Sequence, residues 1–206
     1  MDEKLTVRHW CRISSGLVRK DGKIVMEDPS GKGTAFLASV YRRAGLNYPK
    51  FFKMDALSKA GFIASEVLLS DENGRFVPRE DRAVLLFSSS GCEADDIHYR
   101  RTITDDNYYP SPSLFVYTLP NVVTGEIAIR NLYRGETSAF VLEHFDAEEI
   151  VRIVCEAFED SSTESAIAGW IECPDDDNVD ALLFLAEKGE GDALTSEYIS
   201  QLFENK

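Results

Sequence analysis

The sequence lacks the features that mark two common functional classes. It has no excess of basic residues: 22 Lys and Arg stand against 36 Asp and Glu, for a formal net charge of -14. Nucleic-acid binding is driven by clustered Lys and Arg that displace counterions, so this balance argues against a nucleic-acid partner. No apolar run approaches the roughly 20 residues of a membrane-spanning helix, and the opening MDEKLTVRHW lacks the apolar core of a secretory signal. We therefore expect a cytoplasmic protein with no membrane partner.

Cysteine is sparse as well. Four cysteines, Cys11, Cys92, Cys155 and Cys173, lie far apart, and none forms a C-x-x-C pair. This spacing excludes the common zinc and redox motifs and the dense disulfide framework of small secreted domains. We expect reduced thiols. Cys155 stands among apolar neighbours, which predicts a buried, inert side chain rather than a nucleophile.

Motifs for metals and phosphates are incomplete. The segments GCEADDIHY (91–99) and EHFDAEE (143–149) place a His near carboxylates, but neither has the i, i+4 His pair of helical zinc sites. Acidic residues at a helix N-terminus or solvated loop charges are the favoured interpretations of both segments. SGKGT (30–34) is similar to a phosphate loop, yet Met26 stands where the first Gly is required, so the segment predicts a turn. We expect neither a metal nor a cofactor.

The residues that are present predict a folded α/β chain. With 206 residues, 44% hydrophobic and 11% aromatic, the sequence is typical of one globular domain over 1–206. A polar loop is expected at 95–113. Because strand and helix patterns alternate, they indicate a layered α/β domain. Apolar periodicity predicts strands at 5–13, 82–90, 137–143, 165–172 and 179–187, and helices at 52–69, 119–135, 146–158 and 194–203.

The helical pattern LPNVVTGEIAIRNLYRG (119–135) contains a glycine, Gly125, which costs helix stability unless something requires it. The order Pro120-Asn121, Gly125, Ala128-Ile129-Arg130, Gly135 resembles the segment before the active site of β-ketoacyl-acyl carrier protein synthases. Weaker matches extend this resemblance over about residues 53–187. It implies the N-terminal half of a thiolase-like fold, a layered α/β half-domain with a mixed central sheet. It also implies that Gly125 lies against a neighbouring backbone too close for a Cβ.

The resemblance also locates the family's nucleophile. In these condensing enzymes the attacking Cys follows the inner Gly by nineteen residues, and here that position is His144. The acidic residue that follows the family's Ala-Gly-Gly strand falls in register on Glu172, while Trp170 replaces its second Gly. An imidazole does not hold a stable acyl thioester. The family's two catalytic histidines belong to a second half that we do not find in the printed sequence, so it predicts no confident catalytic residue.

Two functions follow from these observations. The first is a non-catalytic β-ketoacyl synthase-like module, a partner or accessory subunit in type II fatty acid or polyketide synthesis. In the family, the strand before the nucleophile pairs with its twin across a two-fold axis, which makes 137–143 a candidate edge for a homodimer or for a heterodimer with a ketosynthase. The candidate interface residues are Thr137, Ala139, Val141 and Glu143.

The second function is an active acyl-transfer or condensing enzyme, similar to 3-oxoacyl-acyl carrier protein synthase. It would use His144 or Cys155 in a new role, or a complementary chain that supplies the absent half. An acyl carrier protein is a further candidate partner of either form. Because carrier proteins present an acidic helix, one would need a basic patch, for which the sequence offers Arg42, Arg43, Lys50 and Lys53.

Overall fold

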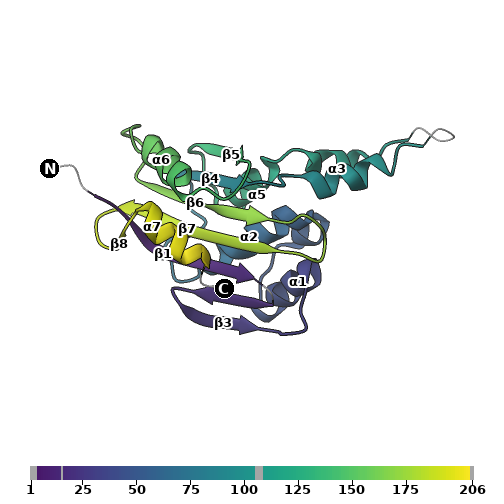
Figure 1. Cartoon of the computed structure of the whole chain (residues 1–206), viewed down its shortest axis with the longest axis horizontal. Coiled ribbons are helices and arrows are strands. Elements are labelled where there is room, and N and C mark those ends of the chain that lie inside the picture. Colours follow the sequence, from purple (N-terminus) through teal and green to yellow (C-terminus); the bar gives the residue numbers. More distant parts are fainter. Residues whose placement is uncertain (1–3, 15, 105–108, 205–206) are drawn as a thin grey trace.

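A computed structural model describes residues 4–14, 16–104 and 109–204 of the protein. Its centre is an eight-stranded mixed sheet with the order β3-β2-β1-β7-β6-β4-β5, and β8 pairs with β1 (Figure 1). The strands are β1 (Leu5–Ser14), β2 (Leu17–Lys20), β3 (Lys23–Glu27), β4 (Arg82–Ser88), β5 (Thr137–Val141), β6 (Ser165–Glu172), β7 (Asp180–Lys188) and β8 (Asp192–Ala193).

Strand direction changes in the middle of the sheet. β4 runs parallel to both β5 and β6, whereas β7 is antiparallel to β6 and to β1. The central strands β4, β6 and β7 are almost continuously buried, as expected for strands covered on both faces. The predicted α/β class with a mixed central sheet is confirmed.

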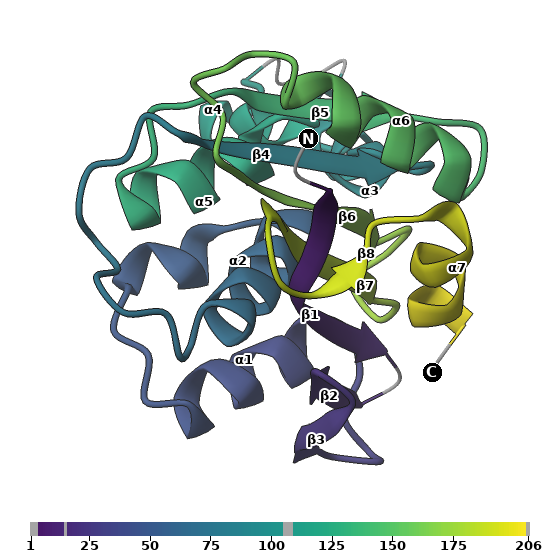
Figure 2. The same ribbon diagram turned by 90° about the vertical axis from the view of Figure 1, so that its left-hand side faces the viewer.

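Helices cover both faces of the sheet (Figure 2). On one face α1 (Gly33–Arg43), α2 (Ala56–Leu68) and α5 (Val122–Asn131) enclose a core that includes Leu37, Phe62 and Ile127. On the other, α6 (Ala147–Ala157) and α7 (Ser196–Glu204) pack Ile150 and Ile199 on the sheet. Alternate residues of β4 serve the two cores, with Leu86 on the first and Leu85 on the second.

The remaining helical segments connect these layers. They are the 3₁₀ helix η1 (Pro49–Lys53), α3 (Glu93–Arg100), α4 (Pro112–Phe115) and the 3₁₀ helix η2 (Val116–Thr118). The polar loop predicted for 95–113 is therefore wrong at both ends, although its residues 105–108 lie outside the described residues. Acidic residues in the first turn and basic residues in the last stabilise the short α3, and the sequence pattern did not show this. The structure also adds β2, β3, α1 and η1, which were not predicted.

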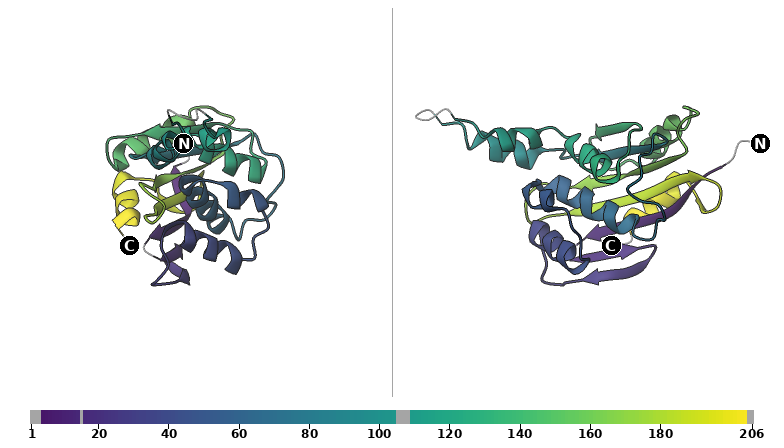
Figure 3. Two further views of the ribbon diagram at one scale, coloured as in Figure 1. Left: turned by 90° about the vertical axis from the view of Figure 1, so that its right-hand side faces the viewer. Right: turned by 180° about the vertical axis from the view of Figure 1, so that it is seen from behind.

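The segment that begins with α3 extends away from the body of the protein. We call residues 93–104 and 109–119 the arm; it contains α3, α4 and η2. Figures 1 and 3 show the arm projecting beyond the end of the sheet, in the direction away from the N-terminus. Among the described helices, including those of the arm, none combines the length and apolar character needed to cross a membrane.

The prediction for Gly125 is wrong. The glycine lies in α5 as expected, but a Cβ at this position would meet no atom within 4 Å. A neighbouring helix instead lies close to Gly61 in α2, where a Cβ would overlap Val123 of α5. Helices α2 and α5 therefore approach each other at Gly61. Gly135 also requires its small size, because a Cβ there would lie 2.5 Å from the Arg82 carbonyl oxygen.

Candidate interaction surface

Strand β5 forms one edge of the sheet. It pairs in parallel with β4, from Val84↔Thr137 to Ser88↔Val141, and no strand lies on its other side in the described chain. Thr137, Val141 and Glu143 are exposed, and Ala139 is half-buried. A strand at the edge of a sheet presents unpaired backbone N–H and C=O groups to any chain that can pair with them. The structure therefore places the four candidate interface residues on or beside a free edge.

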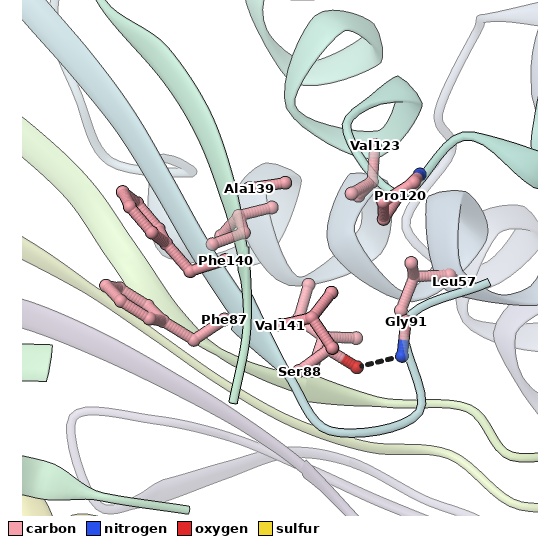
Figure 4. A pocket seen from close by; sticks show the side chains of 11 residues that line it. Leu57, Phe87, Ser88, Gly91, Pro120, Val123, Ala139, Phe140 and Val141 are labelled. Atoms are coloured by element: carbon pink, nitrogen blue, oxygen red, sulfur yellow. Dashed lines mark hydrogen bonds between the residues drawn. The ribbon is translucent and has the colours of Figure 1, made fainter. Parts of the chain in front are cut away.

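The arm continues this edge as an exposed apolar surface. Gly91, which precedes α3, lies where a Cβ would be 3.5 Å from Val141 Cγ2 and 3.9 Å from Pro120. Figure 4 shows Gly91, Pro120 and Val141 around one small cleft. Exposed apolar side chains follow along the arm, and the polar sequence of the segment hid them: Ile97, Ile103, Tyr109, Phe115, Val116 and Leu119. Apolar side chains that gather in this way on a protein surface mark interaction sites.

The cleft beside β5 is too small to hold an acyl chain. Its walls come from Leu57, Ser88, Val123, Ala139 and Val141, among other residues (Figure 4), and its volume is about 10 Å³. That is about the space of one water molecule. The described residues around the cleft therefore leave room for little more than one water molecule.

His144 lies between the end of β5 and the start of α6, and its side chain is exposed. It makes no hydrogen bond or ion pair with any described residue. The other two histidines are occupied elsewhere, since His9 lies 2.8 Å from Asp21 and His98 lies 3.6 Å from Asp176. An activated nucleophile needs an adjacent base or cation, and no described residue bonds this imidazole in that way.

The residue after His144, Phe145, belongs to an aromatic cluster. Phe145 packs edge-to-face on Trp170 of β6, with ring centroids 5.6 Å apart, and stacks on Phe203 of α7 at 4.0 Å. Trp170, which stands where the family's second Gly is usual, is 2% exposed. The preceding position, Gly169, requires a glycine, because a Cβ there would overlap the Leu182 carbonyl oxygen. Phe145, Trp170 and Phe203 therefore form one aromatic cluster between β6 and α7.

Glu172, the acidic residue in register with the family's, has a structural role. Its carboxylate accepts hydrogen bonds from the Ser89 N–H, from the Ser90 N–H at 3.3 Å and from the Ser90 hydroxyl at 2.6 Å. The Ser88 hydroxyl in turn accepts from the Gly91 N–H at 2.9 Å (Figure 4). These bonds fix the SSSG turn after β4, which carries the start of the arm.

The prediction for Cys155 is also wrong. Its neighbours Val154 and Phe158 are buried as expected, but Cys155 itself is exposed on the outer face of α6. A helix turns 100° per residue, so a run of apolar neighbours in sequence does not share one face. Partial burial still raises the pKa of the Cys155 thiol, which lowers its nucleophilicity. The four cysteines are all described and all free.

Charges cover the outer face of α6. Arg152 lies 2.5 Å from the carboxylate of Glu149 and also pairs with Glu156. These i, i+3 and i, i+4 contacts are typical of a solvent-facing helix surface. The outward-facing side of the helix that follows His144 therefore carries charged side chains.

A pair of carboxyl groups attaches the arm to the body. Asp95 of α3 is buried and shares a hydrogen bond with Asp55, whose carboxylate caps α2 through the N–H groups of Leu57 and Ser58. Burial, the charge of Asp55 and the shared hydrogen bond raise the pKa of Asp95 to about 8. Asp176 and Asp96 also face this pair and act in the same direction.

Two residues of the basic cluster predicted for a carrier protein make contacts within the protein. Lys50 lies 2.7 Å from Glu126, and the guanidinium of Arg42 lies 5.9 Å from the ring centroid of Phe52. Arg43 and Lys53 are exposed. The four residues therefore present a smaller free positive surface than the sequence suggests.

Comparisons with known proteins find matches among solved structures. No protein-family model and no curated protein matches the chain. Solved structures do match. The ishigamide ketosynthase/chain length factor is 17% identical, with a TM-score of 0.62, and the match covers 90% of this chain and 62% of that one. The ketosynthase ApeO in complex with its chain length factor ApeC, from Xenorhabdus doucetiae, matches at 12% identity and TM-score 0.59. A type II polyketide ketosynthase bound to its acyl-carrier protein, AntDE:AntF, matches at 11% and 0.61.

These likenesses define the class of fold. The chain has the thiolase-like fold of the ketosynthases and chain length factors, as the sequence resemblance implied. It spans less than two thirds of the ishigamide and AntDE chains. The matched chain of the ApeO and ApeC complex is closer in length, with 97% of this chain aligned to 90% of it.

Proposed function

We propose that the protein is a non-catalytic partner subunit that pairs with a ketosynthase of type II polyketide or fatty acid synthesis. The observation that carries the proposal is the free edge of β5, continued by the exposed apolar side chains of the arm. A partner strand pairs with the β5 backbone while its neighbouring side chains cover Val141 and the arm. The neighbours named for a ketosynthase with its chain length factor support a heterodimer of this kind.

A non-catalytic role is supported by the site around His144. The imidazole makes no hydrogen bond or ion pair with a described residue, it lies at the exposed surface, and the outer face of α6 is charged. The alternative of an active condensing enzyme finds no supporting contact in the described residues. An acyl carrier protein remains a secondary partner, received at Arg43 and Lys53 or on the ketosynthase subunit.

The test compares two strand edges. Val141 on β5 and Ile24 on β3 are equally exposed, at 58% and 55%, and each lies in a strand at one end of the sheet. A lysine at Val141 must be desolvated when a partner strand covers it. We expect Val141→Lys to weaken association with the ketosynthase of the source cells at least tenfold. Ile24→Lys is the matched control and leaves it unchanged.

Two measurements determine whether the variants still associate with a ketosynthase. Affinity capture with mass spectrometry tests for a ketosynthase in near-stoichiometric amount, and light scattering gives the mass of the protein alone. A ketosynthase captured by wild type and by Ile24→Lys, but lost with Val141→Lys, supports the proposal. A self-dimer that is unaffected by Val141→Lys, with no ketosynthase captured, contradicts it.

A further inference from the structure

A groove lies at the other end of the sheet from β5. It runs between β3, α1 and α2 and has a volume of about 430 Å³. This size falls in the range of sites for small molecules, which are mostly apolar with a few placed polar groups. The apolar walls come from two strand residues and three residues of the helical layer: Val25, Met26, Val40, Leu46 and Val67.

The groove carries more positive than negative charge, although the protein as a whole is acidic. The carboxylate that lines it, Glu66, is buried and is shared by two guanidiniums, with Arg75 at 2.7 Å and Arg130 at 3.0 Å. Of these three charged groups, Glu66 and Arg75 line the groove and offset each other. Arg43 adds a positive charge at the rim, where it donates a hydrogen bond of 3.4 Å to the Glu27 carbonyl oxygen.

A strained residue holds the two inner guanidiniums. Phe76 has φ 65°, a left-handed conformation that is rare and costly for a bulky side chain. Its ring contacts both Arg75 and Arg130, with their guanidinium carbons 4.7 Å and 4.6 Å from the ring centroid. Arg75 also donates to the buried amide oxygen of Asn131 at 2.8 Å. The cations are therefore fixed in place before any ligand arrives, which reduces the entropy cost of binding.

We propose that this groove binds a small amphipathic anion, with an anionic head on Arg43 and Arg75 and an apolar body along Val25, Val40 and Val67. A guanidinium pairs with carboxylate or phosphate through two parallel hydrogen bonds. The volume suits a body of roughly eight carbons. The inference goes beyond the partner role, because the groove and β5 lie at opposite ends of the sheet.

The experiment measures binding of three eight-carbon probes to the whole protein by calorimetry and by chemical-shift changes. Octanoate and octyl phosphate carry anionic heads of the two kinds, and 1-octanol is the neutral analogue. We expect either anion to bind at least tenfold more tightly than 1-octanol. The shifts should fall on Val25, Met26, Leu46 and Val67, and the tighter of the two anions identifies the head group.

Two arginines of α1 provide the matched variants. Arg43 lines the groove, whereas its neighbour Arg42 is equally exposed and stacks on Phe52 instead. We expect Arg43→Ala to weaken the anion about tenfold and Arg42→Ala to change it less than twofold. Equal binding of octanoate and 1-octanol, an equal loss in both variants, or shifts outside the groove would each overturn the proposal. The partner test on Val141 is unaffected by any of these results.

Discussion

Asp95, in the first turn of α3, shares a hydrogen bond with Asp55, the residue that caps α2. One carboxyl group must keep its proton for this bond to exist, and burial with the charge of Asp55 raises the pKa of Asp95 to about 8. The attachment of the arm to the body is therefore linked to proton binding.

We expect this pair to make stability depend on pH. Unfolded Asp95 has its ordinary pKa of 3.8, so between that value and about 8 the folded protein binds a proton that the unfolded chain does not. The free energy of unfolding then falls as the pH rises. The stabilisation is fully present below the unfolded pKa and is lost as the pH passes the folded one.

Asp95→Asn tests this link, because the amide keeps the shape and cannot ionise. Urea denaturation at about pH 5 and about pH 9 should show a smaller loss of stability in the variant than in wild type. Glu93→Gln, in the same first turn and exposed, is the control. Parallel pH profiles for all three proteins would disprove the assignment.

The two helical glycines give opposite predictions for the same substitution. Gly125→Ala meets open space and should raise the free energy of unfolding by up to about 1 kcal/mol, because Ala is the better helix former. Gly61→Ala forces its methyl group into Val123 and should cost about 1–3 kcal/mol. Denaturant midpoints measure both effects. The same sign for both variants would mean that α2 and α5 do not meet at Gly61.

Incubation with an acyl thioester should leave the protein unmodified. His144 has no base beside it, and the pKa of Cys155 is raised by burial, so little thiolate is present at neutral pH. Intact-mass spectrometry after several hours is the measurement, with His144→Ala and Cys155→Ser as companions. An adduct that His144→Ala abolishes would restore the condensing-enzyme alternative.

Trp170→Ala should cost about 3–5 kcal/mol of stability, because the side chain is 2% exposed and supports Phe145. The cavity left behind is apolar and should take up a small aromatic molecule such as benzene. Thermal unfolding with and without benzene checks this. A variant that loses stability without gaining from benzene would mean that Phe145 and Phe203 collapse into the space.

The sequence predicted the elements whose burial dominates their composition. β4, β6 and β7 read as apolar runs because both faces are covered, and Asp146 identified the start of α6, where it accepts a hydrogen bond from the Glu149 N–H at 3.0 Å. The family resemblance placed β5 before His144, and the structure puts that strand at the edge. Its role in pairing stays a prediction.

Other features depended on contacts that a single sequence does not contain. β3 was missed because its residues are mostly exposed and show no alternation. The arm was mistaken for a loop because its apolar side chains face outward among Asp, Tyr and Pro. Gly125 and Gly61 look alike in sequence, and only the crossing of α2 and α5 tells them apart. The groove is lined by residues of β3, α1 and α2, and its Glu66 pairs with Arg130 of α5. These residues lie far apart in the sequence, so no local pattern connects them.

The ion pairs of Glu149, Arg152 and Glu156 affect how easily the outer face of α6 could be covered. Any domain that came to cover α6 would have to strip water from three charges, at several kcal/mol for each ion that is not fully compensated. A few polar substitutions adapt an apolar helix face to water. Adapting a charged face to burial requires several substitutions at once, because every charge must be removed or paired. The charges on the outer face of α6 therefore favour contact with water over burial against an apolar surface.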